Sequence, residues 1–311
     1  MSPQRYLVTG ATGFIGNACI RQLLNTGHEV AGLYRGDTPP DLDLPKDAVR
    51  WLRADLTDEA SVSIQMADVR PTHMIALGWH MGPGNQQAVE NFLWINYSIA
   101  LLFTFAASGG ERVVFCGSCM EYDWSQEQKL HETQTPLLPD TPYGVAKAAL
   151  HNAYGSLCVK LGLSGAWARP FFLYGPHESR YRLAADVIIS CLQEQPVKCS
   201  HGRQRRDFLH VADVAAAMCK LLHSDLTGAV NIGSGQAVPL SKLIMEAANQ
   251  IGRPDLIQLG ALPARANDVP LVEADTTRLR YGLGFHPQFS LKSGITDTIA
   301  WWRQELKRQV T

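Results

Sequence analysis

The stretch TGATGFIG at residues 9–16 decides the fold of this chain. It follows a short apolar run at residues 6–9 and opens a segment with the apolar spacing of a helix. Gly10 allows a tight turn, Gly13 lets the backbone approach a pyrophosphate, and Gly16 permits close packing of helix on strand. In this context the pattern predicts a dinucleotide at the helix N-terminus, with an ordinary glycine-rich turn as the alternative. The expected contacts are Gly10, Thr12, Gly13, Phe14, Ile15 and Gly16.

Beyond this turn, the first 165 residues alternate β-rich apolar runs with helical patterns, which is typical of βαβ units on a parallel sheet. We expect strands at residues 6–9, 29–34, 51–54, 73–77 and 112–116, and helices at 16–26, 91–107 and 142–161. Right-handed crossovers would place helices on both faces of the sheet. The predicted fold class is therefore α/β, a doubly wound parallel sheet of the Rossmann type.

The chain changes character after an apolar strand pattern at residues 166–172, where it becomes richer in proline and glycine and less regular. We expect residues 1–170 to form a dinucleotide-binding domain and residues 171–311 to form a smaller, interleaved substrate-binding lobe. Residues 230–232 read as one more strand that returns to the main sheet. The boundary between the two parts is therefore not clean in the sequence.

Composition favours a small-molecule ligand. The 28 Lys and Arg residues nearly balance the 29 Asp and Glu residues, so no net field attracts nucleic acid or a membrane surface. Seven scattered cysteines indicate reduced thiols and a cytoplasmic protein. Cys116 and Cys119 form a lone CxxC without a second pair, so we expect no metal. No run approaches the roughly 18 apolar residues of a membrane span, so we expect a soluble protein.

A tyrosine and a lysine at residues 143–147, in the sequence YGVAK, are the candidate proton-transfer pair. Asp140, Thr141 and Pro142 precede them and predict a helix start. The spacing places the phenol and the ammonium on one helical face, about 6 Å apart along the axis. A neighbouring cation favours phenolate, so we expect Lys147 to lower the pKa of Tyr143.

These segments together make the chain resemble the extended short-chain dehydrogenases, which include nucleotide-sugar epimerases, dehydratases and ketoreductases. The resemblance also rests on Ser118, RPFFLYGP at 169–176, RDFLHVADV at 206–214 and ADTTRLRYGLGFHP at 274–287. It implies that Ser118 hydrogen-bonds a substrate carbonyl oxygen, that Tyr143 donates the proton, and that Lys147 also binds the nicotinamide ribose. Asn96 matches a family asparagine that supports the site, although a purely local hydrogen bond would explain it equally well.

The end of the second strand bears on the choice of dinucleotide. An enzyme that uses NAD usually carries Asp or Glu there, but this chain has Tyr34 followed by Arg35. A guanidinium suits a 2′-phosphate, so NADP is favoured and NAD stays open. By resemblance, Asp55 and Leu56 contact the adenine, although Asp55 would also serve as the cap of the next turn.

Departures from the family pattern narrow the reaction. Dehydratases place an acid pair directly after the hydroxyl residue, whereas Cys119 and Met120 follow Ser118 here. The family's dual epimerase-reductase uses a cysteine and a histidine whose positions fall on Met120 and Tyr181, and simple 4-epimerases carry asparagine where this chain has Phe172. Reduction of a 4-keto-6-deoxy sugar nucleotide is the favoured reaction. The sugar pocket would be formed by Trp79, His80, Cys119, Met120, Phe172 and His177.

For the nucleotide end, Arg206 and Arg265 resemble two family arginines that hold the diphosphate, and two cations suit a dianion. The alternatives are an epimerase, a reductase of a non-nucleotide carbonyl, and a non-catalytic NADPH-sensing module. By resemblance, the helices at 91–107 and 142–161 would pair with a second subunit as a four-helix bundle in a homodimer. Apolar residues on more than one face would also suit burial within one subunit.

Overall fold

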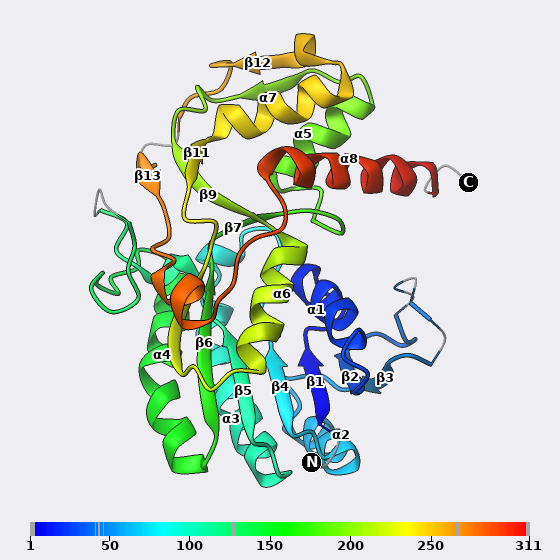
Figure 1. Cartoon of the computed structure of the whole chain (residues 1–311), viewed down its shortest axis with the longest axis vertical. Helices are drawn as coiled ribbons and strands as arrows, with labels where there is room; N and C mark the ends of the chain where they lie inside the picture. Colours follow the sequence, from blue (N-terminus) through cyan, green and yellow to red (C-terminus); the bar gives the residue numbers. More distant parts are fainter. Residues whose placement is uncertain are drawn as a thin grey trace.

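The computed structural model describes residues 4–40, 42, 44–45, 47–125, 129–264 and 268–308. The chain forms a larger lobe around a parallel sheet and a smaller lobe beyond the ends of the strands (Figure 1). In Figure 1 the carboxyl ends of the sheet strands point toward the smaller lobe. In α/β proteins ligands bind at that end of the strands, so the space between sheet and lobe is where the site is expected.

Seven parallel strands make the central sheet in the order β10–β6–β5–β4–β1–β2–β3. Their bounds are β1 (Arg5–Thr9), β2 (Glu29–Tyr34), β3 (Arg50–Arg53), β4 (His73–Ala76), β5 (Arg112–Cys116), β6 (Ser164–Pro170) and β10 (Gly228–Ile232). Every residue of β4 and β5 is buried, as expected for parallel strands covered on both faces. The predicted α/β fold of the Rossmann type is confirmed.

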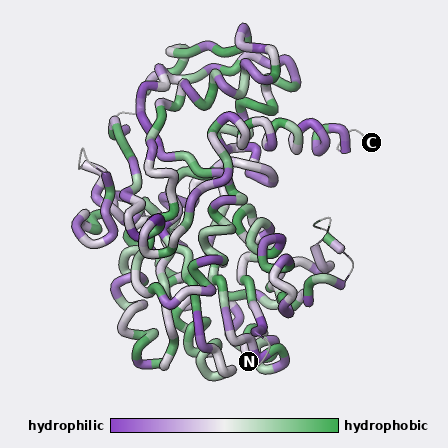
Figure 2. Tube along the Cα trace, in the orientation of Figure 1, coloured by the Kyte–Doolittle hydropathy of each residue, from purple (hydrophilic) through white to green (hydrophobic). Residues whose placement is uncertain are grey.

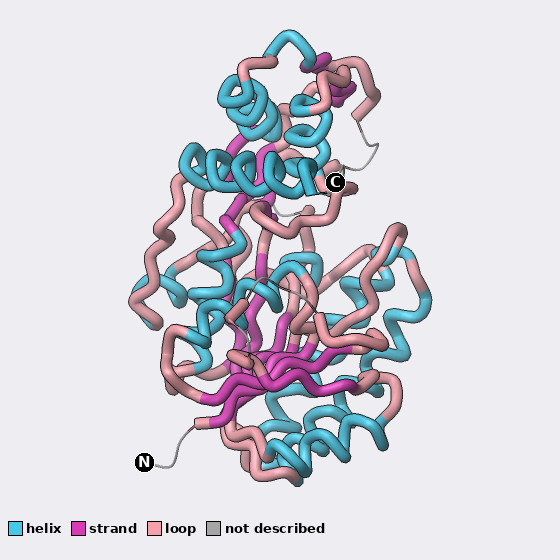
Figure 3. Tube along the Cα trace, turned by 90° about the vertical axis from the view of Figure 1, so that its right-hand side faces the viewer, coloured by secondary structure: helices cyan, strands magenta, loops and turns pink. Residues whose placement is uncertain are grey.

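Helices cover both faces of this sheet, as the view along the sheet in Figure 3 shows. One layer is made by α1 (Phe14–Leu24) and α6 (Val211–Leu222), which pack on each other in a shared apolar core. The opposite layer is made by α2 (Glu59–Val69), α3 (Leu93–Ala107) and α4 (Pro142–Leu161). The two apolar cores of this lobe are made by residues of the strands and of the helices that cover them, and Figure 2 shows many hydrophobic residues along these segments.

The smaller lobe has a separate apolar core. Its helices and strands are α5 (Leu183–Leu192), α7 (Leu240–Ile251), α8 (Leu291–Arg308), β7 (Phe172–Tyr174), β8 (Val197–Cys199), β9 (Arg205–His210), β11 (Ala237–Pro239), β12 (Ile257–Leu259) and β13 (Leu271–Val272). Short helical turns complete the chain: η1 (Asn85–Gln87), η2 (Val89–Phe92), η3 (Cys119–Glu121), η4 (Pro254–Leu256) and η5 (Arg278–Gly282). Strand β9 pairs with β7, β11 and β13 and is the centre of the lobe's sheet.

Several boundaries differ from the sequence-based expectations. The crossover helix α2 was not anticipated, and the expected helix at 91–107 begins as the 3₁₀ turn η2 before α3. The expected strand at 166–172 is two strands, because β6 pairs with β5 and β10 in the main sheet whereas β7 pairs with β9 in the smaller lobe. Strand β10 joins the main sheet and α6 also packs there, while the proposed division near residue 170 stays a prediction.

The segment Val89–Ala107 departs from the expectation that no helix could span a membrane. Within the described residues, this is the one helix that is long and apolar enough to cross a membrane, judged by length and composition alone. Core helices of soluble proteins share that property. It packs against α2 and α4, yet Leu93 is 53% and Phe103 50% exposed. The helix therefore presents an apolar outer face as well as a buried one.

Candidate active site

Three predicted residues meet at the carboxyl end of β5. Ser118 begins η3 two residues after the strand, and Tyr143 and Lys147 lie on the first turns of α4. Thr141 caps α4 by accepting the Gly144 N–H at 3.1 Å, which fixes where the helix starts. The Ser118 hydroxyl lies near the Tyr143 phenol and lowers the pKa of Tyr143. The structure thus brings together a hydroxyl, a phenol and an ammonium at the carboxyl end of β5.

A buried carboxylate, which no motif in the sequence selects, fixes Ser118. Glu121 Oε1 accepts the Ser118 N–H at 2.7 Å, while Ser118 Oγ accepts the Met120 N–H at 3.2 Å. The same carboxylate accepts from Trp167 Nε1 at 2.9 Å and pairs with Arg169 Nε at 2.7 Å. Charge-assisted bonds of this kind hold a loop rigidly, so the Ser118 hydroxyl is presented from a fixed backbone.

Lys147 lies in the interior, with a side chain 2% exposed. Its Nζ donates to Cys116 O at 2.7 Å and lies 3.6 Å from the centroid of the Trp79 ring. Burial lowers the Lys147 pKa to about 8, and Cys116 and Glu121 oppose that shift. The ammonium is therefore close to losing its charge at mildly alkaline pH.

The expected lowering of the Tyr143 pKa is not the net effect in this structure. Burial raises the pKa of Tyr143, Cys116, Glu121 and Cys119 raise it further, and the hydrogen bond with Ser118 lowers it. The ammonium lies 6.0 Å from the Tyr143 ring centroid and is bonded to a carbonyl instead. Tyr143 is accordingly a neutral phenol that can donate a proton.

An asparagine other than the predicted one supports this cluster. Asn91 is fully buried, and its Oδ1 accepts from Trp79 Nε1 at 2.8 Å. Its Nδ2 donates to the carbonyls of Asn85 and Ala88 at 2.6 and 2.7 Å. Asn96, the asparagine that the sequence pattern selected, is exposed.

The glycine-rich turn has the tight backbone that a phosphate cradle requires. Gly10 has φ +64°, and a Cβ at Gly16 would lie 2.1 Å from Gly10 O, so both positions need glycine. Gly13 begins α1 without a side-chain cap, and the first turn carries no acidic residue. Free N–H groups and the helix dipole there suit an anion, so the turn fits a dinucleotide pyrophosphate. Thr12 beside them is exposed, and Phe14 and Ile15 are half-buried.

Strand β2 ends without a carboxylate at its last residue. Tyr34 packs edge-on to Trp51, with ring centroids 6.4 Å apart, and Arg35 is exposed. Asp55 Oδ1 accepts from Thr57 N and Thr57 Oγ1, both at 2.9 Å, which is the local capping role left open by the sequence. Leu56 lies against Gly78 next to the turn. The adenine contacts of Asp55 and Leu56 stay predictions.

The predicted sugar-pocket residues are divided between two places. Trp79 packs edge-on to Tyr143, and Cys119 is buried in a small apolar cluster that Phe172 borders. Met120 and His80 are half-buried. His177, in contrast, is exposed and packs in a tilted arrangement against Trp301 of α8, with ring centroids 4.6 Å apart. This ring contact places His177 against the C-terminal helix.

Arg206 is engaged within the protein. It is 4% exposed, forms an ion pair with Asp268, and donates to the carbonyls of Arg205 and Val269 at 2.8 and 2.9 Å. Its guanidinium carbon lies 5.6 Å from the centroid of the Phe172 ring, beside the apolar cluster. Arg265, the second predicted diphosphate ligand, lies outside the described residues.

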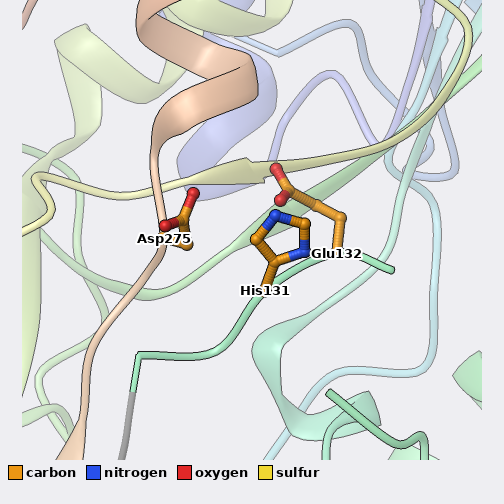
Figure 4. Close-up of side chains that lie close together, drawn as sticks. All are labelled: His131, Glu132 and Asp275. Carbon is orange, nitrogen blue, oxygen red and sulfur yellow. The ribbon is translucent and has the colours of Figure 1, made fainter. Parts of the chain in front are cut away.

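A histidine and two carboxylates gather near β10, where His131, Glu132 and Asp275 place one ligand atom each within 4.8 Å of one another (Figure 4). His131 Nδ1 accepts from Thr133 N at 3.2 Å, so this ring nitrogen is already engaged by a backbone N–H. Glu132 Oε1 accepts from Asn231 N at 2.9 Å. Backbone N–H groups thus engage one atom each of His131 and Glu132, and the absence of a metal stays a prediction.

The model of the NAD dependent epimerase/dehydratase family matches residues 6–233. The chain belongs to this family. It is similar to a dTDP-4-dehydro-6-deoxy-D-allose reductase of Streptomyces bikiniensis, at 27% identity over 97% of each chain. It also resembles the UDP-glucose 4-epimerase of Thermus thermophilus in complex with NAD, with a TM-score of 0.84 and 26% identity over 96% of this chain and 99% of that one.

MoeE5 in complex with UDP-glucose and NAD is another similar structure, with a TM-score of 0.81 and 29% identity over 97% of this chain and 99% of that one. Membership of the NAD dependent epimerase/dehydratase family confirms the predicted resemblance and the class of NAD(P)-dependent enzyme. Reductases and epimerases both occur among the relatives. Family membership therefore does not distinguish reduction from epimerisation, and the choice between them has to be argued from the residues of this chain.

Proposed function

We propose that this chain is an NADPH-dependent reductase that converts the 4-keto group of a nucleotide-activated 4-keto-6-deoxy sugar into an alcohol. The observation that carries the proposal is the contact between Ser118 and Tyr143, with Lys147 one helical turn away. The similarity to a dTDP-4-dehydro-6-deoxy-D-allose reductase along the whole chain supports the same substrate class.

The absence of a free acid pair argues against dehydration. Cys119 and Met120 follow Ser118, and Glu121 is fully engaged with Ser118, Trp167 and Arg169. Its carboxylate is therefore not available to remove or add a substrate proton. An epimerase remains the second candidate because of the similarity to UDP-glucose 4-epimerase. An epimerase returns its cofactor to the starting redox state in each turnover, whereas the proposed reductase consumes NADPH.

In the proposed reaction, a bound dinucleotide supplies the hydride that adds to the carbonyl carbon. Tyr143 donates its phenolic proton to the carbonyl oxygen, and Ser118 Oγ hydrogen-bonds that oxygen while negative charge develops on it. Lys147 offers positive charge beside the phenol, which favours the phenolate left after proton transfer. Solvent then returns the proton to Tyr143, so one carbonyl and one proton yield one alcohol for each hydride delivered.

The proposed preference for NADP rests on the end of β2. Tyr34 occupies the position where a carboxylate would hold the ribose hydroxyls, and Arg35 follows it at the surface. Arg53 ends the adjacent strand and pairs with Asp37 at 2.6 Å. Two arginines at this edge make the site attractive to a 2′-phosphate.

For the substrate, we assign the sugar to Cys119, Met120, Phe172 and His80 beside Tyr143, and the diphosphate to Arg206 with Arg265. Arg206 would exchange its ion pair with Asp268 for the diphosphate, or share it. His177 fits this pocket less well because its ring packs against Trp301 of α8. Trp79 would form the wall next to the phenol.

We also propose that the protein is a cytoplasmic homodimer. The outer faces of α3 and α4 expose apolar side chains, namely Leu93, Phe103, Val145 and Val159. Exposed apolar patches of this kind commonly mark subunit interfaces. A single species with the mass of a monomer in analytical ultracentrifugation at micromolar concentration would contradict the dimer.

The experiment that tests the proposed function is turnover of 4-keto-6-deoxy sugar nucleotides with NADPH, with Tyr143→Phe as the matched variant. This variant keeps the ring and its packing but lacks the phenolic hydroxyl that donates the proton. It should bind NADPH as the wild type does and should lose nearly all reduction. Retained turnover would refute the assigned role of Tyr143.

A further inference from the structure

The ammonium of Lys147 is held between two groups, and one of them is an aromatic face. Nζ donates to Cys116 O at 2.7 Å and lies 3.6 Å from the centroid of the Trp79 ring. The next ring, Phe115, is 5.6 Å away. A cation within about 6 Å of an indole face is attracted by the ring's negative potential, and the attraction grows when water is excluded.

Trp79 is itself fixed in orientation. Its Nε1 donates to Asn91 Oδ1 at 2.8 Å, and Asn91 is anchored by two bonds to backbone carbonyls. The ring also meets Tyr143 edge-on, at 6.4 Å between centroids and 87° between planes. The indole therefore has its face toward the ammonium and packs edge-on with the phenol, without freedom to rotate.

We propose that Trp79, oriented by Asn91, is a positioning residue that keeps the Lys147 ammonium charged and in place beside Tyr143. The inference rests on the proposed function, in which Lys147 has to carry its charge during reduction. Trp79 then has an electrostatic role in addition to its role as a wall of the pocket. Asn91 acts on the site through its hydrogen bond to the indole.

The surroundings of Lys147 show why such support matters. Burial disfavours its charged form, and the titratable groups that face it are Cys116 on β5, Glu121 on η3 and Tyr143 on its own helix. The Glu121 charge is already matched by Arg169, and burial raises the pKa values of Cys116 and Tyr143, which keeps both neutral. Two neutral groups that do not titrate thus stabilise the cation, the Cys116 carbonyl at 2.7 Å and the indole face of Trp79 at 3.6 Å.

The test is the Lys147 pKa measured in the substrate-free enzyme by NMR. Lysine labelled with ¹³C at the ε position is titrated, and the Lys147 signal is assigned by its loss in Lys147→Arg. In the wild type the indole ring current should shift this signal upfield. In Trp79→Leu, which keeps an apolar side chain, that shift should vanish and the Lys147 pKa should fall by roughly one unit.

Trp79→Phe is the matched variant, because it keeps an aromatic face but cannot donate to Asn91. Its Lys147 pKa should lie between those of the wild type and Trp79→Leu, and it keeps the test open if the leucine variant does not fold. A Lys147 pKa that is unchanged or higher without the indole would overturn the proposal. So would a wild-type signal that shows no ring-current shift.

This titration needs no turnover, which separates it from the proposed function. If no sugar nucleotide is reduced but the Lys147 pKa falls as expected, the positioning role stands and the substrate assignment fails. With a turning substrate, the alkaline decline of kcat should move to lower pH in Trp79→Leu, while KM changes less than kcat. If kcat of Trp79→Leu declined at the same alkaline pH as kcat of the wild type, the role of the indole would be contradicted.

Discussion

Glu121 and Arg169 form a fully buried ion pair, Oε2 to Nε at 2.7 Å, and the same carboxylate accepts the backbone N–H of Ser118. The pair joins β6 to the turn after β5 and so fixes the hydroxyl of the candidate active site. Its members are 48 residues apart in the chain. This long-range contact makes the stability of the fold and the geometry of the site depend on the same two charges.

Breaking this pair should be costly. Glu121→Gln leaves the Arg169 guanidinium buried without its counter-charge, so we expect the free energy of unfolding to fall by roughly 3–5 kcal/mol in urea titration. Asp68→Asn, which breaks the exposed ion pair between Arg50 and Asp68, is the control and should cost at most about 1 kcal/mol. Equal, small losses for both variants would mean that the buried pair does not stabilise the site.

The rate of reduction should decline with alkaline pH because of Lys147. Its folded-state pKa is lowered to about 8, so raising the pH through that value removes the charge beside Tyr143. In Lys147→Arg the charge persists, and we expect a slower enzyme whose kcat no longer declines in that window. A pH profile with the same alkaline limb in both proteins would show that another group titrates.

The same shift predicts a trend in stability. The unfolded chain holds the Lys147 proton up to its ordinary pKa, so between about pH 8 and 10 the unfolded state binds more protons than the folded state. The contribution of Lys147 to the free energy of unfolding should therefore rise with pH in that window. Chemical denaturation of the wild type and Lys147→Met at both ends of the window measures this difference, and parallel curves would contradict it.

Arg35 should decide between the two dinucleotides. Replacing it by serine removes the cation offered to a 2′-phosphate, so Kd for NADPH should rise by about tenfold or more while Kd for NADH changes little. Arg50→Ser is a suitable control, because that arginine lies at the start of β3, away from the carboxyl end. Fluorescence titration measures both constants, and an unchanged Kd for NADPH would remove the basis for the NADP preference.

Much of the fold followed from local patterns. The glycine turn, the alternating strands and the YGVAK helix are each encoded within a few residues, and the structure has them where the sequence predicted. The crossover helix α2 was not predicted because its apolar residues are weakly periodic and lie on more than one face, with Ile64 exposed. Its three buried residues are Val62, Met66 and Val69, and that spacing was the available signal.

The parts of the site that the sequence did not reveal depend on contacts between distant segments. Glu121 pairs with Arg169, and Arg206 pairs with Asp268, which is 62 residues away in the chain. The spacing of residues in the sequence predicts neither contact. The sequence pattern selected Asn96, but Asn91 is the asparagine that accepts a hydrogen bond from the Trp79 indole. The upward shift of the Tyr143 pKa likewise arises from burial, which a motif does not report.

The most direct test of the proposed reaction is NADPH oxidation with freshly generated dTDP-, CDP- and GDP-4-keto-6-deoxyhexoses, with NADH and the Tyr143→Phe variant run in parallel. We predict that one nucleotide sugar is reduced stoichiometrically, faster with NADPH than with NADH, and not by Tyr143→Phe. Tight NADPH binding with no oxidation by any of the three would contradict the proposed reaction and would favour an epimerase or a reductase of an unrelated carbonyl.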